Sequence, residues 1–232
     1  MGDAHGKLCA PGVLTRRPRH DATNQATNGR KKIPFSMNPS PPARRTINHI
    51  GLTVPDIFAA IDWYRDVLGF THIMGPRVLE AGAQATHETP SIFGPRFRRA
   101  YQAHMLAGNG VGLELFQFVD PPVERRPDNF EYWKIGVFHI CVSDPDVASM
   151  ALRIVATGGR QRAPVYAFVP GLPYQLVYCE DPWGNIIEVL SHDYAEVFAH
   201  WPQPGMTAAT TYVTRDEAAR ETVRAKSGGD SA

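Results

Sequence analysis

Two histidines and two glutamates recur at matching positions in this chain of 232 residues. His49 and His139 each stand in a β-rich run, and Glu114 and Glu188 each stand in a strongly apolar one. A carboxylate in an apolar strand is costly to bury unless it is paired or binds a cation. Imidazole nitrogen and carboxylate oxygen together suit a divalent ion such as Zn, Ni, Co, Mn or Fe. We therefore expect one divalent metal ion bound by His49, Glu114, His139 and Glu188.

The evidence for this set is an internal duplication. At an offset of 90 residues, His49 matches His139, and each histidine precedes a matching Pro-Asp pair. At an offset of 74 residues, residues 110–115 match residues 184–189, so that Glu114 coincides with Glu188. A lone histidine in a strand is more often a core residue than a ligand, and the duplication reverses that expectation. The histidines without a repeat partner are expected to be structural or surface residues: His72, His104, His192 and His200.

The change of offset by 16 residues locates an insertion in the first repeat. Residues 76–99 are rich in Gly, Pro, Thr and Arg, and we interpret them as a loop over the site. Candidate substrate contacts are Phe93, Arg96 and Phe97 in this loop, together with Phe116, which shares a strand face with Glu114. Such a loop suits a bulky, aromatic or polyketide-like substrate.

Each repeat has the pattern of strand, helix and three further strands. Asp56 and Asp146 are expected N-caps of helices over residues 57–68 and 147–156. The predicted strands of the first repeat are 46–54, 70–74, 100–107 and 111–119, and those of the second are 136–143, 161–165, 174–179 and 185–191. Cys141 and Cys179 fall in such strands, where a cysteine is usually a small buried hydrophobe.

Composition divides the chain into three parts. Residues 1–45 hold nine Lys or Arg against two Asp, lack an apolar period, and are expected to be a disordered basic extension. The remaining residues hold 15 basic and 21 acidic side chains, which argues against a nucleic-acid partner. No apolar run is long enough for a membrane helix, so we expect a cytoplasmic protein without a membrane partner. Residues 193–232 are expected to form a tail with short helices.

Five motifs carry a resemblance to a known superfamily: Asn48 to Asp56, Trp63 to Phe70, Val111 to Phe116, Phe138 to Ile140 and Asp181 to Glu188. With these motifs, residues 46–192 resemble the vicinal oxygen chelate superfamily. That superfamily includes glyoxalase I, methylmalonyl-CoA epimerase, extradiol dioxygenases, and the fosfomycin and bleomycin resistance proteins. The resemblance implies an α+β fold in which two βαβββ modules, residues 46–120 and 135–192, form a cupped, partly closed mixed sheet around a metal site.

The order His, Glu, His, Glu resembles that of bacterial glyoxalase I and, in part, that of the epimerases. This resemblance implies a lyase, isomerase or epimerase that abstracts a proton next to a metal-bound carbonyl of a small-molecule substrate. It points to Glu188 as the catalytic base and to Glu114 as its opposite number. It also implies a homodimer, because related chains with one pair of modules often complete their sites across subunits.

Two other classes stay open at this point. An extradiol-type dioxygenase holds Fe(II) with two histidines and one carboxylate, and Glu114 fills a position that such a site leaves free. A metal-free protein that binds an antibiotic or another small molecule leaves the buried His and Glu set uncompensated. Each alternative therefore accounts for fewer of the four residues than the metal-dependent lyase or isomerase does.

Overall fold

The computed structural model describes residues 43–82, 92–199, 201–206 and 212–227. The chain divides into two units, residues 1–45 and residues 46–232. Nearly all of the first unit, for which we predicted disorder, lies outside the described residues. No helix within the described ranges is long and apolar enough to cross a membrane.

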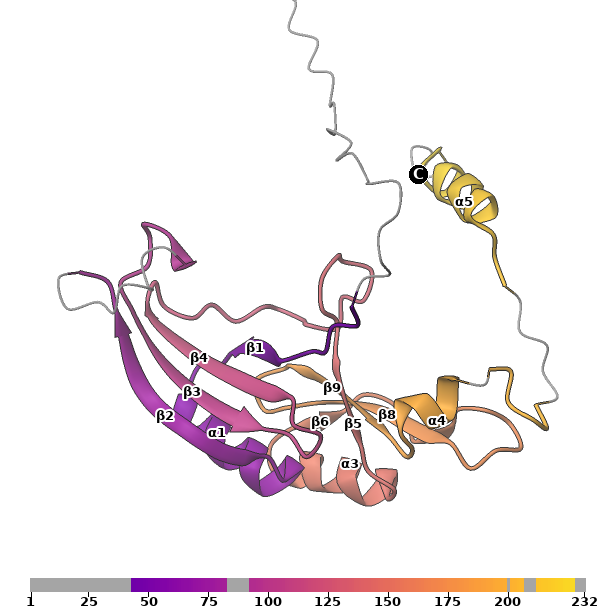
Figure 1. Ribbon diagram of the computed structural model, residues 1–232, viewed down its shortest axis with the longest axis horizontal. Coiled ribbons are helices and arrows are strands. Elements are labelled where there is room, and N and C mark those ends of the chain that lie inside the picture. Colours follow the sequence, from indigo (N-terminus) through magenta and orange to yellow (C-terminus); the bar gives the residue numbers. More distant parts are fainter. Residues whose placement is uncertain (1–42, 83–91, 200, 207–211, 228–232) are drawn as a thin grey trace, which may run out of the picture. The chain divides into compact units, whose positions relative to one another are not determined.

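The first repeat forms a four-stranded sheet with one helix (Figure 1). Its elements are β1 (His49–Thr53), α1 (Ile57–Leu68), β2 (Thr71–Glu80), β3 (Arg99–Leu106) and β4 (Gly112–Asp120). The strand order is β1-β4-β3-β2. β1 pairs with β4 in parallel, whereas β4 pairs with β3, and β3 with β2, in antiparallel fashion.

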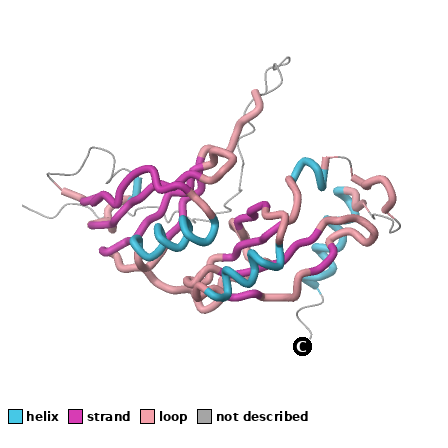
Figure 2. Tube along the Cα trace, turned by 90° about the horizontal axis from the view of Figure 1, so that it is seen from below, coloured by secondary structure: helices cyan, strands magenta, loops and turns pink. Residues whose placement is uncertain are grey.

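The second repeat forms a separate five-stranded sheet on the same plan (Figure 2). Its elements are β5 (Ile140–Ser143), α3 (Val147–Ala156), β6 (Arg160–Gln161), β7 (Tyr166–Ala167), β8 (Gln175–Glu180) and β9 (Ile186–Leu190). The order is β5-β9-β8-β6, with β7 also paired to β8 and with β5 parallel to β9. α4 (Tyr194–Phe198) and α5 (Arg215–Ser227) follow.

The predicted α+β class and the two modules are confirmed, and the helices have the predicted bounds. Asp56 caps α1 by accepting hydrogen bonds from two backbone N–H groups, and Gly69 ends the helix at a φ of 72°. Asp146 caps α3 through the Ser149 N–H. The strands differ more: β2 extends to Glu80, into the expected loop, and β5 begins only at Ile140. In the described sheets, the strands of each module pair only with one another, and the two sheets do not join into one barrel.

A helix covers one face of each sheet, and one apolar core contains residues of both modules. In the first module, Leu113, Leu115 and Met105 point toward α1 and are buried. In the second, Ile187 and Val189 point into the same core beside α3. Since neighbouring residues of a strand face opposite ways, the residues between them lie on the face of each sheet away from the helix.

A buried hydrogen-bond network joins α1 to the second module. The Tyr64 hydroxyl donates to Asp181 Oδ2 at 2.9 Å, and Trp63 Nε1 donates to Thr157 Oγ1 at 3.0 Å. Asp181 also accepts from the backbone N–H groups of Trp183 and Asn185. Burial raises the pKa of Asp181, whereas its hydrogen bonds act in the opposite direction. The network therefore offsets the cost of burying the Asp181 carboxylate at the contact between the two modules.

We expect Tyr64→Phe to lower the free energy of unfolding by about 1–3 kcal/mol, because it removes one donor from a buried carboxylate. Urea denaturation followed by circular dichroism measures this loss. Tyr132→Phe is the control, because the Tyr132 side chain is 62% exposed. Equal stability of the two variants would show that this contact does not couple the modules.

Candidate metal and active site

The first predicted pair, His49 and Glu114, lies on the face of the first sheet away from α1. Parallel pairing sets Gly51 beside Glu114 and His49 beside Gly112. His49 Nε2 lies 3.5 Å from Glu114 Oε2, and His49 Nδ1 lies 2.8 Å from Asn48 Oδ1. The Glu114 side chain is 17% exposed, as expected for a residue in an apolar strand, whereas that of His49 is 53% exposed. The expectation of burial is thus wrong for His49.

The second pair, His139 and Glu188, occupies the equivalent face of the second sheet. His139 Nε2 lies 2.9 Å from Glu188 Oε2, and the Glu188 side chain is 12% exposed. Tyr178 lies directly opposite Glu188 on β8, so that its hydroxyl faces this carboxylate. Burial, and then the Glu188 charge, raise the pKa of Tyr178 well above its usual range, so the phenol stays protonated.

His139 precedes β5, and aromatic side chains hold its ring in place. The ring centroids of Phe138 and Tyr178 lie 4.9 and 5.4 Å from that of His139. Phe130 packs against Phe138 and Tyr178. The guanidinium carbon of Arg162 lies 4.2 Å from the centroid of the Phe130 ring.

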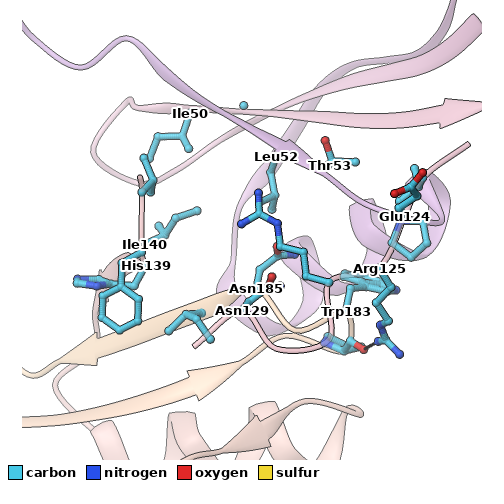
Figure 3. A pocket seen from close by; sticks show the side chains of 18 residues that line it. Ile50, Leu52, Thr53, Glu124, Arg125, Asn129, His139, Ile140, Trp183 and Asn185 are labelled. Carbon is cyan, nitrogen blue, oxygen red and sulfur yellow. Dashed lines mark hydrogen bonds between the residues drawn. The ribbon is translucent and has the colours of Figure 1, made fainter. Parts of the chain in front are cut away.

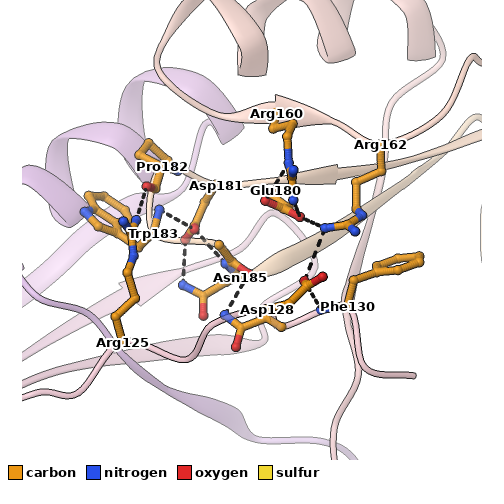
Figure 4. Close-up of polar contacts among 12 residues, drawn as sticks. Arg125, Asp128, Phe130, Arg160, Arg162, Glu180, Asp181, Pro182, Trp183 and Asn185 are labelled. Carbon is orange, nitrogen blue, oxygen red and sulfur yellow. Dashed lines mark hydrogen bonds and ion pairs between the residues drawn. The ribbon is translucent and has the colours of Figure 1, made fainter. Parts of the chain in front are cut away.

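A polar cluster fixes the segment that carries Phe130 (Figure 4). Arg162 pairs with Asp128 and with Glu180, and Arg160 donates two hydrogen bonds to Glu180. Asn129 Nδ2 donates to Gly184 O at 2.7 Å. The connection between the modules is therefore tied to the second sheet at the place where it leads into His139.

The structure brings the four predicted ligands together as two pairs. Among the described residues, no three His, Cys, Asp or Glu side chains lie close enough to hold a metal ion. Each pair fits one side of a metal site in chemistry and spacing, since two ligands of a tetrahedral ion lie about 3.3 Å apart. Within the described part of the chain, the only buried side-chain polar atoms without a hydrogen-bond partner are His104 Nε2 and His139 Nδ1. Both belong to imidazoles beside the predicted glutamate ligands.

A cavity of about 760 Å³ lies along β1 and the start of β5 (Figure 3). It is lined by residues of β1, residues 123–126 and 129, residues 137–140 and the turn at 182–186. His139 borders this cavity, but His49, Glu114 and Glu188 do not. The cavity therefore reaches one member of the second pair and does not contain the four-residue set.

The candidate substrate contacts divide into buried and accessible residues. Phe97 is 3% exposed and packs with Phe93, Phe116 and Phe118 in a separate apolar cluster. Phe97 is thus a core residue here rather than part of a loop surface. Arg96 is exposed, and Phe93 and Phe116 are half-buried. Residues 83–91 of the predicted loop lie outside the described ranges.

Sequence reasoning missed two polar residues beside Glu114. His104 lies directly opposite Glu114 on β3, with its Nε2 atom 3.8 Å from Glu114 Oε1. Gln102 is 5% exposed and donates to the same oxygen at 2.5 Å. The offset of 74 residues was a usable signal, because it aligns His104 with Tyr178, which lies opposite Glu188.

The family model of the Glyoxalase/Bleomycin resistance protein/Dioxygenase superfamily matches residues 46–189. The chain belongs to this superfamily. Its match covers both modules and all four predicted ligands. No curated protein matches the sequence.

One solved structure supports the same fold at low identity, and others are similar to a lesser degree. A glyoxalase family protein from Bacillus cereus is 15% identical, with a TM-score of 0.53, and the match covers 66% of this chain and 98% of that one. A mutant of glyoxalase I from Zea mays is 17% identical, with a TM-score of 0.44, covering 63% of this chain and 45% of that one. The fosfomycin resistance protein FosX from Listeria monocytogenes is 16% identical, with a TM-score of 0.43, covering 66% and 98%.

Cys141 is exposed, contrary to expectation, whereas Cys179 is buried as predicted. Local desolvation, and then the Glu188 charge, raise the pKa of the Cys141 thiol to about 12. We expect Cys141 to react slowly with a disulfide reagent at pH 8, because little thiolate is present far below its pKa. The measurement uses a Cys9→Ser, Cys179→Ser double variant, with the urea-unfolded protein as the control. Equally fast reaction in the folded and unfolded states would contradict this.

Proposed function

We propose that this chain is a divalent-metal-dependent lyase, isomerase or epimerase of the glyoxalase I type. His49, Glu114, His139 and Glu188 are the proposed ligands of one Ni, Co, Zn or Mn ion. The observation that supports this most is the repeated His and Glu pair, on the same face of both sheets. A divalent ion held by these residues would supply a Lewis acid that polarises a substrate carbonyl and stabilises the negative charge developing next to it.

Glu188 is the proposed base. Its carboxylate lies beside His139 and the Tyr178 hydroxyl, and the Tyr178 ring packs against Phe138 in an aromatic wall. From this position, Glu188 takes a proton from the carbon beside the carbonyl and returns it to the adjacent carbon or to the other face of the same carbon. The aromatic wall limits access of water to this carboxylate while it carries the proton. Glu114 is the equivalent carboxylate in the first module.

The functional unit in this proposal is a homodimer, in which the first pair of one subunit meets the second pair of the other. Large apolar side chains on the chain's surface support a partner surface: Ile47, Tyr132, Trp133, Ile135 and Val137 are each at least 62% exposed. The outer edges of β1 and β5 carry no neighbouring strand in the described sheets. A small-molecule substrate and a cytoplasmic location remain predictions, as does the absence of membrane and nucleic-acid partners.

Metal content tests the ligand set. We expect purified wild-type protein to hold about one Ni, Co, Zn or Mn ion per chain, and His139→Ala to lose it, because metal affinity depends on every ligand. Inductively coupled plasma mass spectrometry measures the metal, and deuterium exchange into hemithioacetals and 2-substituted carbonyl compounds measures the chemistry. Glu188→Gln is expected to abolish that exchange.

His72→Ala is the matched control, since the exposed His72 side chain hydrogen-bonds to the Met74 carbonyl of its own strand and lies outside the proposed site. It is expected to keep both metal and exchange. Iron as the only bound metal would favour a dioxygenase instead. No metal after reconstitution would exclude the four-ligand site and leave a small-molecule binding protein.

Mixed dimers test whether the site forms between subunits. We expect His49→Ala and Glu188→Gln chains, refolded together in equal amounts, to recover about a quarter of the wild-type deuterium exchange. Half of the dimers are then mixed, and each mixed dimer has one site with all four ligands. If each chain builds its own site, mixing restores nothing, because every chain carries one of the two substitutions. Each variant refolded alone is the control.

A further inference from the structure

A row of polar side chains crosses all four strands of the first sheet. Arg77 on β2 donates through Nε to Gln102 Oε1 at 2.6 Å, and Gln102 on β3 donates through Nε2 to Glu114 Oε1 at 2.5 Å. Glu114 on β4 then faces His49 on β1 through its other oxygen, Oε2. Arg77 and Gln102 are direct cross-strand partners. The row therefore ends at both proposed ligands of the first module.

The second sheet lacks this row at the equivalent places. The residue at the position of Gln102 is Leu176, and Tyr166 on β7 pairs with it where Arg77 pairs with Gln102. Leu176 is buried in an apolar cluster with Leu190. Glu188 instead faces Tyr178, its direct partner on the neighbouring strand. The duplication has kept the ligand types but not the groups that surround the two carboxylates.

We infer that Gln102, oriented by Arg77, is a positioning residue that holds Glu114 in place to bind the metal ion. This inference rests on the proposed function. An amide group can present either its oxygen or its NH₂ to a neighbour, and a carboxylate needs the NH₂. The Arg77 guanidinium carries only donors, so it holds the amide oxygen on its own side and directs the NH₂ to Glu114.

The charge and burial of these groups suit this role. Gln102 is one of the few buried polar side chains of the described residues, and both ends of its amide are bonded. Residues that hydrogen-bond to metal ligands typically contribute ten- to hundredfold to metal affinity, because they fix the ligand before the ion arrives. Gln102 hydrogen-bonds to the Oε1 atom of Glu114, and the other carboxylate oxygen, Oε2, faces His49.

Titration with Co(II) tests the role in metal binding. Gln102→Leu is expected to weaken Co(II) binding by about ten- to hundredfold and to change the visible absorption spectrum of the bound ion. Arg77→Met is expected to weaken binding in the same direction, and Arg77→Lys, which keeps a donor, to recover affinity. Gln161→Leu is the control, because Gln161 hydrogen-bonds to the Ala163 carbonyl and to neither glutamate. Wild-type affinity and spectrum in Gln102→Leu would overturn the inference.

A measurement without metal separates this inference from the proposed function. In the metal-free wild type, the side-chain NH₂ protons of Gln102 are expected to exchange slowly with solvent in nuclear magnetic resonance spectra, and faster in Arg77→Met. Equally fast exchange in both proteins would overturn the positioning role, whatever the metal result. If the wild type binds no Co(II) but shows this difference in exchange, the proposed function fails while the hydrogen-bonded row stands.

Discussion

The parallel pairing of the first and last strands of each module is the constraint on which the site depends. A parallel pair needs a crossover connection, and here α1 and α3 begin those connections and cover one face of the sheets. His49 begins β1, and His139 immediately precedes β5. The pairing places each histidine on the same face as a glutamate of the last strand of its module. Since the helix occupies one face, the His and Glu pair is left on the other, where a ligand has access.

Contacts between the modules add a second constraint. Residues of both modules share one apolar core, and Asp181 receives the Tyr64 hydroxyl together with donors from its own turn. The same turn, through Gly184, holds Asn129 of the connection between the modules. The arrangement that buries Asp181 thus also fixes the path of the chain toward Phe138 and His139. In this way the packing between modules reaches the second half of the site.

Local signals account for what could be predicted from the sequence. The bounds of α1 and α3 follow from an Asp cap and a helical apolar period, which need only a few neighbouring residues. The extension of β2 to Glu80 was not predictable in this way, because its Gly, Pro and Arg residues suggest a loop and only pairing with β3 makes them a strand.

The same distinction applies to the candidate site. Duplication identified two His and Glu pairs, and the structure finds each pair in contact. It did not identify Gln102 or His104, whose position beside Glu114 comes from cross-strand register with β4 rather than from nearby sequence. His49 was expected to be buried because its strand is apolar, but β1 lies at the edge of its sheet and leaves the imidazole half exposed.

The two halves of the site differ in a way that bears on their proposed roles. In the first, a guanidinium and an amide hold Glu114 from one side, and the histidine is open to solvent. In the second, Glu188 lies beside a phenol and an aromatic wall, and Tyr166 occupies the position equivalent to Arg77. A carboxylate held by fixed donors suits a ligand that must not move, whereas one bordered by aromatic rings suits a group that takes up and releases a proton. The asymmetry therefore supports Glu114 as the fixed ligand and Glu188 as the base, a division of roles that the identical residue types in the two repeats do not reveal.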